Sequence, residues 1–246
     1  DNLWGYGGTS LTIEGNRIAN AASGGYDGLT ASSFINNTVT GNGQAAASPE
    51  DYGVSVVGNG SILSKNIFSG NLGQGILVYN NVQPTSLNNR ISQNRMFDNG
   101  KLGIDLSNSS STSGNNVTLN DANDADTGPN NGLNFPQFSQ TALVGTNLIL
   151  QGCAPTGSSI ELFEADVSPT SASGVSAGAN QLGRTQDYGE GERYLLTLTE
   201  GVDEDTVTTP VDCATLTDAD GNSAEGMSPF QWTIPLPADV ALGDKL

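Results

Sequence analysis

Four oxygen-bearing side chains fall within six positions of a single loop, at Asp121, Asn123, Asp124 and Asp126. Calcium takes about six to eight oxygen ligands, and a flexible Asp/Asn loop can supply several of them. The loop is not an EF-hand, because Ala125 stands at its fifth position and no glutamate closes it. The loop is therefore a candidate calcium site. The alternative is a solvated turn rich in Asp and Asn.

A second acidic turn has the pattern D-x-D-G-N, with Asp218, Asp220 and Asn222 as its oxygen donors. It offers fewer carboxylates than the first loop and is the weaker calcium candidate. Calcium is the one cofactor that the sequence suggests.

Catalytic chemistry is restricted by the absence of histidine. Serine–histidine triads and histidine-bound zinc are excluded, so acid–base catalysis would depend on carboxylates. In the first 110 residues these are few and scattered, at Asp27, Asp51, Asp98 and Asp105. We expect Asp105 to face outward from a strand over 103–106, either solvated or as the neighbour of a bound calcium. A lyase-like site combining Asp105 with Arg95 and Lys101 is the enzymatic alternative.

Repeats over the first 110 residues indicate the elements that position these side chains. Asparagine begins similar segments at Asn16, Asn37, Asn66 and Asn94, which are 21, 29 and 28 residues apart. Glycine leads short apolar runs at positions 28, 53, 75 and 103, at spacings of 25, 22 and 28. Such a period, with short β segments and sharp Asn/Gly corners, is typical of a solenoid of about four turns. Asparagines at equivalent corners can stack into amide ladders.

The motif N-x-[IVM]-x-x-N followed by G-[IV]-x-[VL] resembles the right-handed parallel β-helix repeats of bacterial extracellular proteins, over roughly residues 1–110. That family includes polysaccharide lyases and hydrolases, phage tailspikes, adhesins and surface proteins without known chemistry. The resemblance implies the fold and leaves the function open.

From Leu143 onward the apolar residues alternate with a period of two, which indicates an antiparallel β-sandwich. The Asp/Asn segment before it resembles the junction that joins such β-helices to an immunoglobulin-like module. We therefore predict an all-β chain with a β-helix over 1–138 and an Ig-like sandwich over 139–246. The resemblance implies a further strand after Leu246, so the sandwich is expected to be incomplete.

The two cysteines, Cys153 and Cys213, match no zinc-binding pattern, and we predict that they form a disulfide. A disulfide implies an oxidising compartment. Two buried free thiols are the alternative.

Composition limits the partners. The net charge is −18 and only 14% of residues are charged, which argues against nucleic acid. Sixteen acidic and three basic residues lie in 141–246, against ten and five in 1–140. No apolar run approaches 18 residues, so no membrane span is expected. Tyr26, Tyr52 and Tyr79 lie near glycine corners, where they either form a sugar platform or pack beneath loops.

The leading interpretation is a non-enzymatic, extracellular or cell-surface structural protein of bacterial type, part of a stalk, adhesin or fibre. Its expected partners are copies of itself joined head to tail, or neighbouring modules of the same chain. The predicted contact joins an N-terminal surface to the C-terminal region of a neighbour, through Leu3, Trp4, Tyr6, Trp232 and Leu246. A polysaccharide lyase or hydrolase, and a carbohydrate-binding module that uses the tyrosines, are the alternatives.

Overall fold

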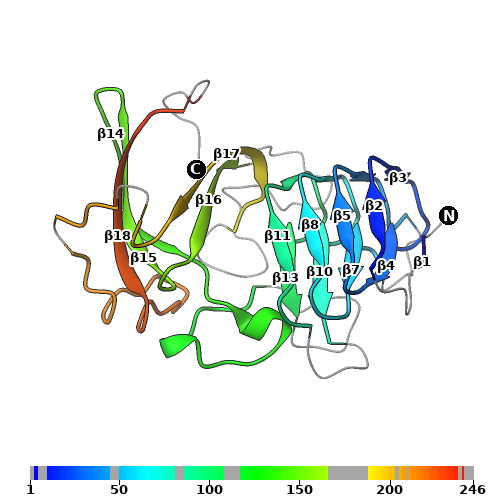
Figure 1. The fold of residues 1–246 in the computed structure, drawn as a ribbon, viewed down its shortest axis with the longest axis horizontal. Coiled ribbons are helices and arrows are strands. Elements are labelled where there is room, and N and C mark those ends of the chain that lie inside the picture. Colours follow the sequence, from blue (N-terminus) through cyan, green and yellow to red (C-terminus); the bar gives the residue numbers. More distant parts are fainter. Residues whose placement is uncertain are drawn as a thin grey trace.

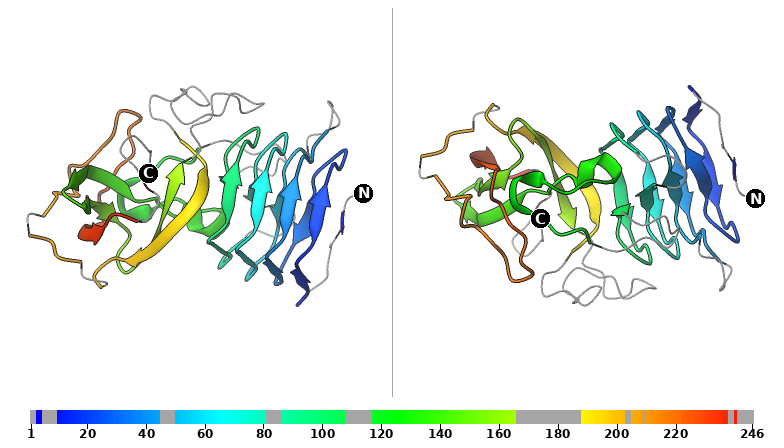
Figure 2. Two further views of the ribbon diagram at one scale, coloured as in Figure 1. Left: turned by 90° about the horizontal axis from the view of Figure 1, so that it is seen from above. Right: turned by 90° about the horizontal axis from the view of Figure 1, so that it is seen from below.

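A computed structural model of the chain describes the backbone of residues 3–4 and residues 10–44, 50–80, 86–107, 117–165, 188–202, 205–208, 210–237 and 240. The chain is an elongated stack of short strands followed by a twisted group of longer strands (Figures 1 and 2). Tyr6 and Leu246 lie outside the described residues, as do the side chains of Leu3 and Trp4. No helix in the described part of the chain is long and apolar enough to cross a membrane.

Three parallel sheets form the stack, and within each sheet neighbouring strands come from successive turns. The first sheet contains β1 (Leu3–Trp4), β4 (Tyr26–Leu29), β7 (Val54–Val56), β10 (Ile76–Tyr79) and β13 (Ile104–Ser107). The second contains β2 (Thr12–Glu14), β5 (Ser33–Ile35), β8 (Ile62–Ser64) and β11 (Arg90–Ser92). The third contains β3 (Arg17–Ala19), β6 (Thr38–Thr40), β9 (Ile67–Ser69) and β12 (Arg95–Phe97). The predicted parallel β-helix is thus confirmed.

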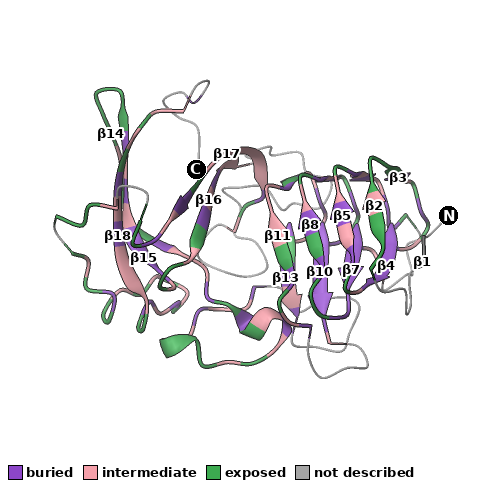
Figure 3. Cartoon of the chain, in the orientation of Figure 1, coloured by how far each residue is buried: buried purple, intermediate pink, exposed green. Residues whose placement is uncertain are grey.

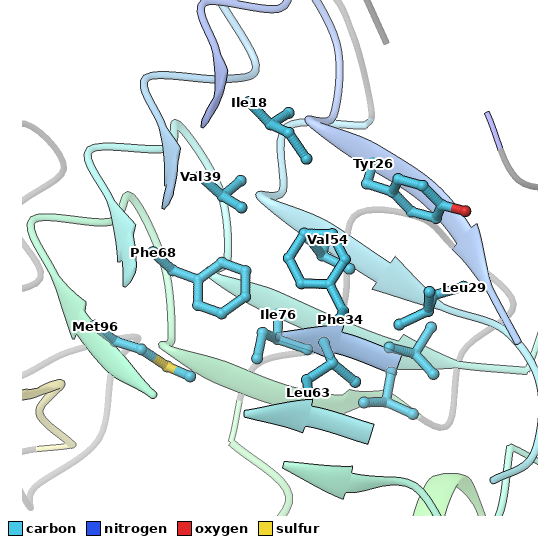
Figure 4. Close-up of a cluster of buried hydrophobic side chains, with 12 residues drawn as sticks. Ile18, Tyr26, Leu29, Phe34, Val39, Val54, Leu63, Phe68, Ile76 and Met96 are labelled. Carbon is cyan, nitrogen blue, oxygen red and sulfur yellow. The ribbon is translucent and has the colours of Figure 1, made fainter. Parts of the chain in front are cut away.

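Each strand of the second and third sheets points its middle side chain inward, because side chains alternate along a strand. The inward positions form continuous columns; the third sheet stacks Ile18, Val39, Phe68 and Met96 in register. Columns from the three sheets meet in one apolar core (Figure 4). In that core the rings of Phe34 and Phe68 stack with centroids 6.4 Å apart. A three-residue strand is therefore stabilised by the column it joins.

The remaining strands are antiparallel, as predicted for the second half of the chain. One sheet contains β14 (Gln137–Val144), β15 (Asn147–Ala154) and β18 (Ser228–Pro235), and a separate pair contains β16 (Ser159–Ala165) and β17 (Gly191–Thr199). Two short 3₁₀ segments, η1 (Ala122–Asp124) and η2 (Pro129–Gly132), precede them. The antiparallel strands of the two sheets share a second apolar core around Leu150, Leu162, Phe230 and Trp232.

Trp232 corrects part of the predicted assembly surface. Its ring stacks on Phe230 with centroids 4.5 Å apart, and only 1% of the residue is exposed (Figure 3 colours the chain by burial). Trp232 faces the core because it alternates with outward-facing neighbours along β18. It therefore does not offer an apolar surface to a neighbouring molecule.

The predicted disulfide is present. Cys153, at the end of β15, is bonded to Cys213, which lies 60 residues later in the chain. Both cysteines are buried, in a small cluster with Ala224. The bond thus ties the long connection before β18 to the three-stranded sheet.

Candidate functional site

Buried asparagines form hydrogen-bonded ladders along the corners of the β-helix. In the first ladder, the backbone N–H and the side-chain Nδ2 of each asparagine both donate to Oδ1 of the next one. Asn37 donates to Asn66 over 2.8 and 3.2 Å, and Asn66 donates to Asn94 over 3.0 and 2.8 Å. Asn16 begins the series by donating to Asn37. These are the asparagines that the repeat analysis identified.

A second ladder runs through Asn42, Asn71 and Asn99 and ends on a carboxylate. Asn42 donates to Asn71, and Asn71 donates to Asn99. Asn99 then donates its backbone N–H to Glu190 Oε2 over 2.9 Å and its Nδ2 to Glu190 Oε1 over 2.8 Å. Glu190 is only 4% exposed and takes the place of the asparagine that another turn would supply.

A third series of hydrogen-bonded corner residues, Ser61 and Asn89, also ends on a residue from outside the stacked turns, Asn130. Ser61 donates its backbone N–H to Asn89 Oδ1 over 2.8 Å, and the backbone N–H of Asn89 donates to Asn130 Oδ1 over 3.0 Å. Asn130 Nδ2 returns a bond to the Asn89 carbonyl. Glu190 and Asn130 were not predicted from the sequence as capping residues. No local pattern marks them, because they lie 91 and 41 residues from the asparagines that they cap.

Further contacts fix the antiparallel strands against the last turn of the β-helix. The backbone N–H of Gln93 donates to Glu161 Oε2 over 2.7 Å, and Arg95 Nε donates to the Glu192 carbonyl over 2.8 Å. Burial raises the pKa of the Glu161 carboxyl, although the Gln93 N–H and the nearby Arg90 act in the opposite direction. We call this contact region the junction. It consists of β12 and the adjacent corners on one side, and of Asn130, Glu161 and 190–192 on the other.

Asp105 does not occupy the solvated position that the sequence predicted. It faces outward from the first sheet but is only 1% exposed, and it accepts a hydrogen bond from Gln74 Nε2 over 3.0 Å. The outer face of this sheet is covered, since Leu77, its neighbour in register, packs with Tyr52 and Tyr79. The solvated interpretation is therefore wrong.

The basic residues of the proposed lyase-like site are engaged elsewhere. Lys101 forms an ion pair with Asp51, Nζ to Oδ2, over 3.1 Å. Arg95 is committed to the junction. The structure therefore does not assemble Arg95 and Lys101 around Asp105.

Asp27 occupies the same outward row as Asp105, three turns earlier. It is buried and accepts hydrogen bonds from Tyr52 Oη over 2.8 Å and from Ser55 Oγ over 2.6 Å. At about 4.8 Å per strand, the two aspartates stand roughly 14 Å apart. Glycosidase carboxylates lie about 5–10 Å apart, so these two do not form such a pair.

The tyrosines pack inside the molecule. Tyr52 and Tyr79 are 0% and 1% exposed in a cluster over the first sheet, and Tyr26 lies in the β-helix core. Burial and the adjacent Asp27 raise the pKa of Tyr52 far above its ordinary value. Of the two alternatives given for these tyrosines, packing is therefore the one that the structure supports, because a sugar platform needs an exposed aromatic face.

The Asp121 loop is a hydrogen-bonded turn. The Asp121 carboxylate accepts from the backbone N–H of Ala125, and Asp124 Oδ1 accepts from that of Asn134. Asp126 Oδ1 is buried without a partner among the described residues. Its pKa is raised by burial and then by the charges of Asp121 and Asp124. No group of three or more acidic, cysteine or histidine side chains in the described chain is arranged to hold a metal, and calcium here stays a prediction.

The second acidic turn serves as a structural support. Asp218 Oδ1 accepts the backbone N–H groups of Asp220 and Asn222, and Asp218 Oδ2 accepts Asn222 Nδ2 over 2.6 Å. Asn222 also accepts the backbone N–H of Asn120, which joins this turn to the segment after the β-helix. Tyr188 donates to Asp220 across the same turn. These bonds give the D-x-D-G-N turn a structural role, and calcium at this turn stays a prediction.

A cavity of about 770 Å³ lies inside the junction. Its floor is the apolar end of the β-helix core, and its other walls come from the segment before β14, from β16 and from the approach to β17. The lining acids are Glu161, Glu190 and Asp218, and no basic side chain is among the described lining residues.

Comparison with known families agrees with this architecture. The family model described as "Right handed beta helix region" matches residues 2–148, more than half of the chain. It covers all the stacked turns and extends into β15. A comparison with curated proteins finds no match.

Proposed function

The chain belongs to the right-handed β-helix family, and we propose that it is a non-enzymatic extracellular structural protein, a segment of a surface stalk, adhesin or fibre. This family is compatible with a structural role and with polysaccharide chemistry, so the proposal depends on the geometry of this chain. A disulfide beside a β-helix is typical of extracellular proteins, which supports that location.

The unbroken hydrogen-bonded stack is the observation that carries the proposal. One ladder runs from Asn16 to Asn94, a second runs from Asn42 into Glu190 of the antiparallel unit, and the column through Asn89 ends on Asn130. A buried amide ladder leaves few ways for one turn to slide or tilt on the next without breaking several bonds. A stack joined in this way is suited to act as a stiff spacer.

The placement of the aspartates supports a role without catalysis. Asp27 and Asp105 are both buried and hydrogen-bonded, and their separation is too large for a glycosidase pair. Asp51 is held by Lys101. The family's polysaccharide chemistry would need carboxylates that reach a substrate.

Head-to-tail assembly is the finer part of the proposal. In the described residues β2 and β3 are the outermost strands of their sheets, and Leu11 beside them is 41% exposed. An uncovered strand edge is a template for pairing with another chain. We place the contact at this edge and at the C-terminal region of a neighbour, without Trp232.

The test combines an activity assay with a measurement of particle size. We expect no cleavage of a polyuronide panel in the presence of calcium, and rods or filaments that lengthen with protein concentration in electron micrographs. Cleavage that is lost in both Asp27→Asn and Asp105→Asn variants would show a polysaccharide enzyme. Particles of one size at every concentration would remove the assembly part and leave the structural role standing.

A further inference from the structure

We propose that the junction cavity is a binding site for an uncharged, largely apolar small molecule that carries a hydrogen-bond-accepting oxygen. This inference goes beyond the structural role proposed above. The cavity lies between the end of the β-helix and the antiparallel strands, which adjoin in both Figures 1 and 2.

The floor of the cavity is the last turn of the β-helix, whose core side chains have no further turn packed on them among the described residues. In the first sheet, Val54, Ile76 and Ile104 occupy the same inward position on successive turns. The first two are 0% exposed, whereas Ile104 is 42% exposed. Met96 and Leu106 of the same last turn also line the cavity. The core thus ends in an apolar surface that faces open space.

The opposite walls are also apolar and incompletely covered. They include Leu133, Phe135, Phe138 and Phe163. Leu133 is 52% exposed and Phe138 is 41% exposed. An apolar guest would gain van der Waals contacts with such walls and would remove their exposed apolar surface from water. The volume of the cavity lies in the usual range for a small-molecule pocket, and an interface between two structural units is a common place for one.

Polar contacts at the rim explain why the space does not collapse. The bonds from Asn99 to Glu190, from Gln93 to Glu161 and from Asn89 to Asn130 satisfy the exposed edge of the last turn. Those bonds have short, fixed lengths, so they set the spacing between the two units. The apolar centre between them cannot close without breaking the bonds at its margin.

Two polar features restrict the chemistry of the ligand. Gln137 lines the cavity and is only 7% exposed, and its Nε2 has no hydrogen-bond partner within the described chain. A buried donor without a partner is costly, and an accepting oxygen on the ligand would satisfy it. The charged lining residues, Glu161, Glu190 and Asp218, are all acidic and disfavour an anion.

The experiment uses the intact 246-residue chain and two fluorescent probes. Nile red is neutral, apolar and carries a carbonyl oxygen, whereas 1-anilinonaphthalene-8-sulfonate is apolar and anionic. We expect saturable binding of one Nile red per chain, and sulfonate binding weaker on the order of tenfold because of the acidic lining.

Matched variants locate the site. Ile104→Trp should fill the cavity and weaken Nile red binding by about tenfold or more, a change in affinity that is easily measured. The control is Ile62→Trp, because Ile62 is also 42% exposed but does not line the cavity. Gln137→Leu keeps a similar shape without the donor and should weaken binding by roughly fivefold. Thermal melts confirm that each variant is folded.

Three results would overturn the proposal. One is the absence of Nile red binding to the folded wild-type chain. Another is an affinity that Ile104→Trp and Gln137→Leu both leave unchanged. The third is an equal loss in Ile62→Trp, which would assign the signal to the outer surface. If Ile104→Trp does not fold, Leu133→Trp replaces it, because Leu133 lines the same cavity and is more exposed.

Discussion

At the scale of single residues, the buried asparagines are the positions where a substitution would break the most hydrogen bonds. Asn66 donates to the Phe34 carbonyl and twice to Asn94, and it accepts two bonds from Asn37. It is 0% exposed, so water cannot replace any partner that is lost. An apolar residue of similar size would leave the backbone N–H of Asn37 and the carbonyl of Phe34, both on the preceding turn, without these partners.

We expect Asn66→Ala to lower the free energy of unfolding by about 3 kcal/mol. The substitution leaves the backbone N–H and the Nδ2 of Asn37 without their acceptor, and the buried Phe34 carbonyl without its donor. Asn16→Ala is the matched control. Asn16 belongs to the same ladder but is exposed, and no preceding asparagine donates to it in the described residues. Its loss should cost less than about 1 kcal/mol. Urea unfolding measures both, and equal losses would contradict the role given to the ladder.

The Asp121 loop carries the calcium prediction. Asp121, Asp124 and Asp126 repel one another, which contributes to the raised pKa of Asp126. A bound cation would relieve that repulsion. We therefore expect EDTA to lower the melting temperature and Asp124→Ala to abolish the difference. Identical melts of the wild-type chain with calcium and with EDTA would end this prediction.

At the scale of elements, short strands depend on connections that lie far away in sequence. Strands of three residues are too short to be stable alone, and they persist because parallel neighbours pair on both sides. The long connection before β18 has little regular structure in its described residues, 205–208 and 210–227. It is tied to the sheet by the bond between Cys153 and Cys213, and the turn over 218–222 within it bonds to Asn120.

Removing this disulfide should therefore destabilise the antiparallel strands. It closes a loop of 60 residues, and the chain-entropy model assigns such a bond about 4 kcal/mol. We expect a reductant to lower the midpoint of denaturant unfolding, and a Cys153→Ala, Cys213→Ala double variant to show the lower midpoint under both conditions. Alkylation followed by intact mass measurement should find no free thiol in the native chain. Two alkylated cysteines would refute the bond.

At the scale of the whole molecule, the junction decides whether the two units behave as one. Glu190, Asn130 and Glu161 complete the polar edge of the last turn. They act as the cap that a solenoid end requires. The antiparallel unit is thus a structural part of the β-helix, and the two should unfold together.

The junction also predicts a dependence of stability on pH. Glu161 faces Arg90 and the Gln93 N–H, and burial raises its pKa in the folded chain. Since the folded state binds the proton more readily than the unfolded state, this group's contribution is fully present below the ordinary pKa of about 4.5. The contribution is lost as the pH rises through the folded pKa.

Glu161→Gln isolates that contribution, because the amide oxygen can still accept from Gln93. We expect the melting temperature of the wild type, relative to this variant, to rise as the pH falls from about 7 to about 5. Glu225→Gln, an exposed position, serves as the control and should show no such trend. A wild-type advantage that grows towards neutral pH would reverse the sign and contradict the assignment.

The sequence by itself determined two kinds of feature: those that repeat along the chain, and the disulfide, for which only one pairing of cysteines exists. Asparagines at 21-, 29- and 28-residue spacings predicted the turns of the β-helix. This spacing marks the turns because each corner has the same construction: a residue in the left-handed backbone conformation, such as Lys65 or Gln93, directly precedes a ladder asparagine. The disulfide was predictable because the chain has only two cysteines and no zinc-binding pattern.

Only the tertiary structure decided which outward-facing row is covered and what caps the stack. Asp105 stands at an outward-facing position of its strand, yet it is only 1% exposed, on a face where its neighbour Leu77 is also buried with Tyr52 and Tyr79. Glu190 reaches Asn99 across 91 residues of sequence. Periodicity specifies the direction of a side chain within its own turn. It carries no information about which distant segment packs against that side chain, because this depends on the packing of the complete chain.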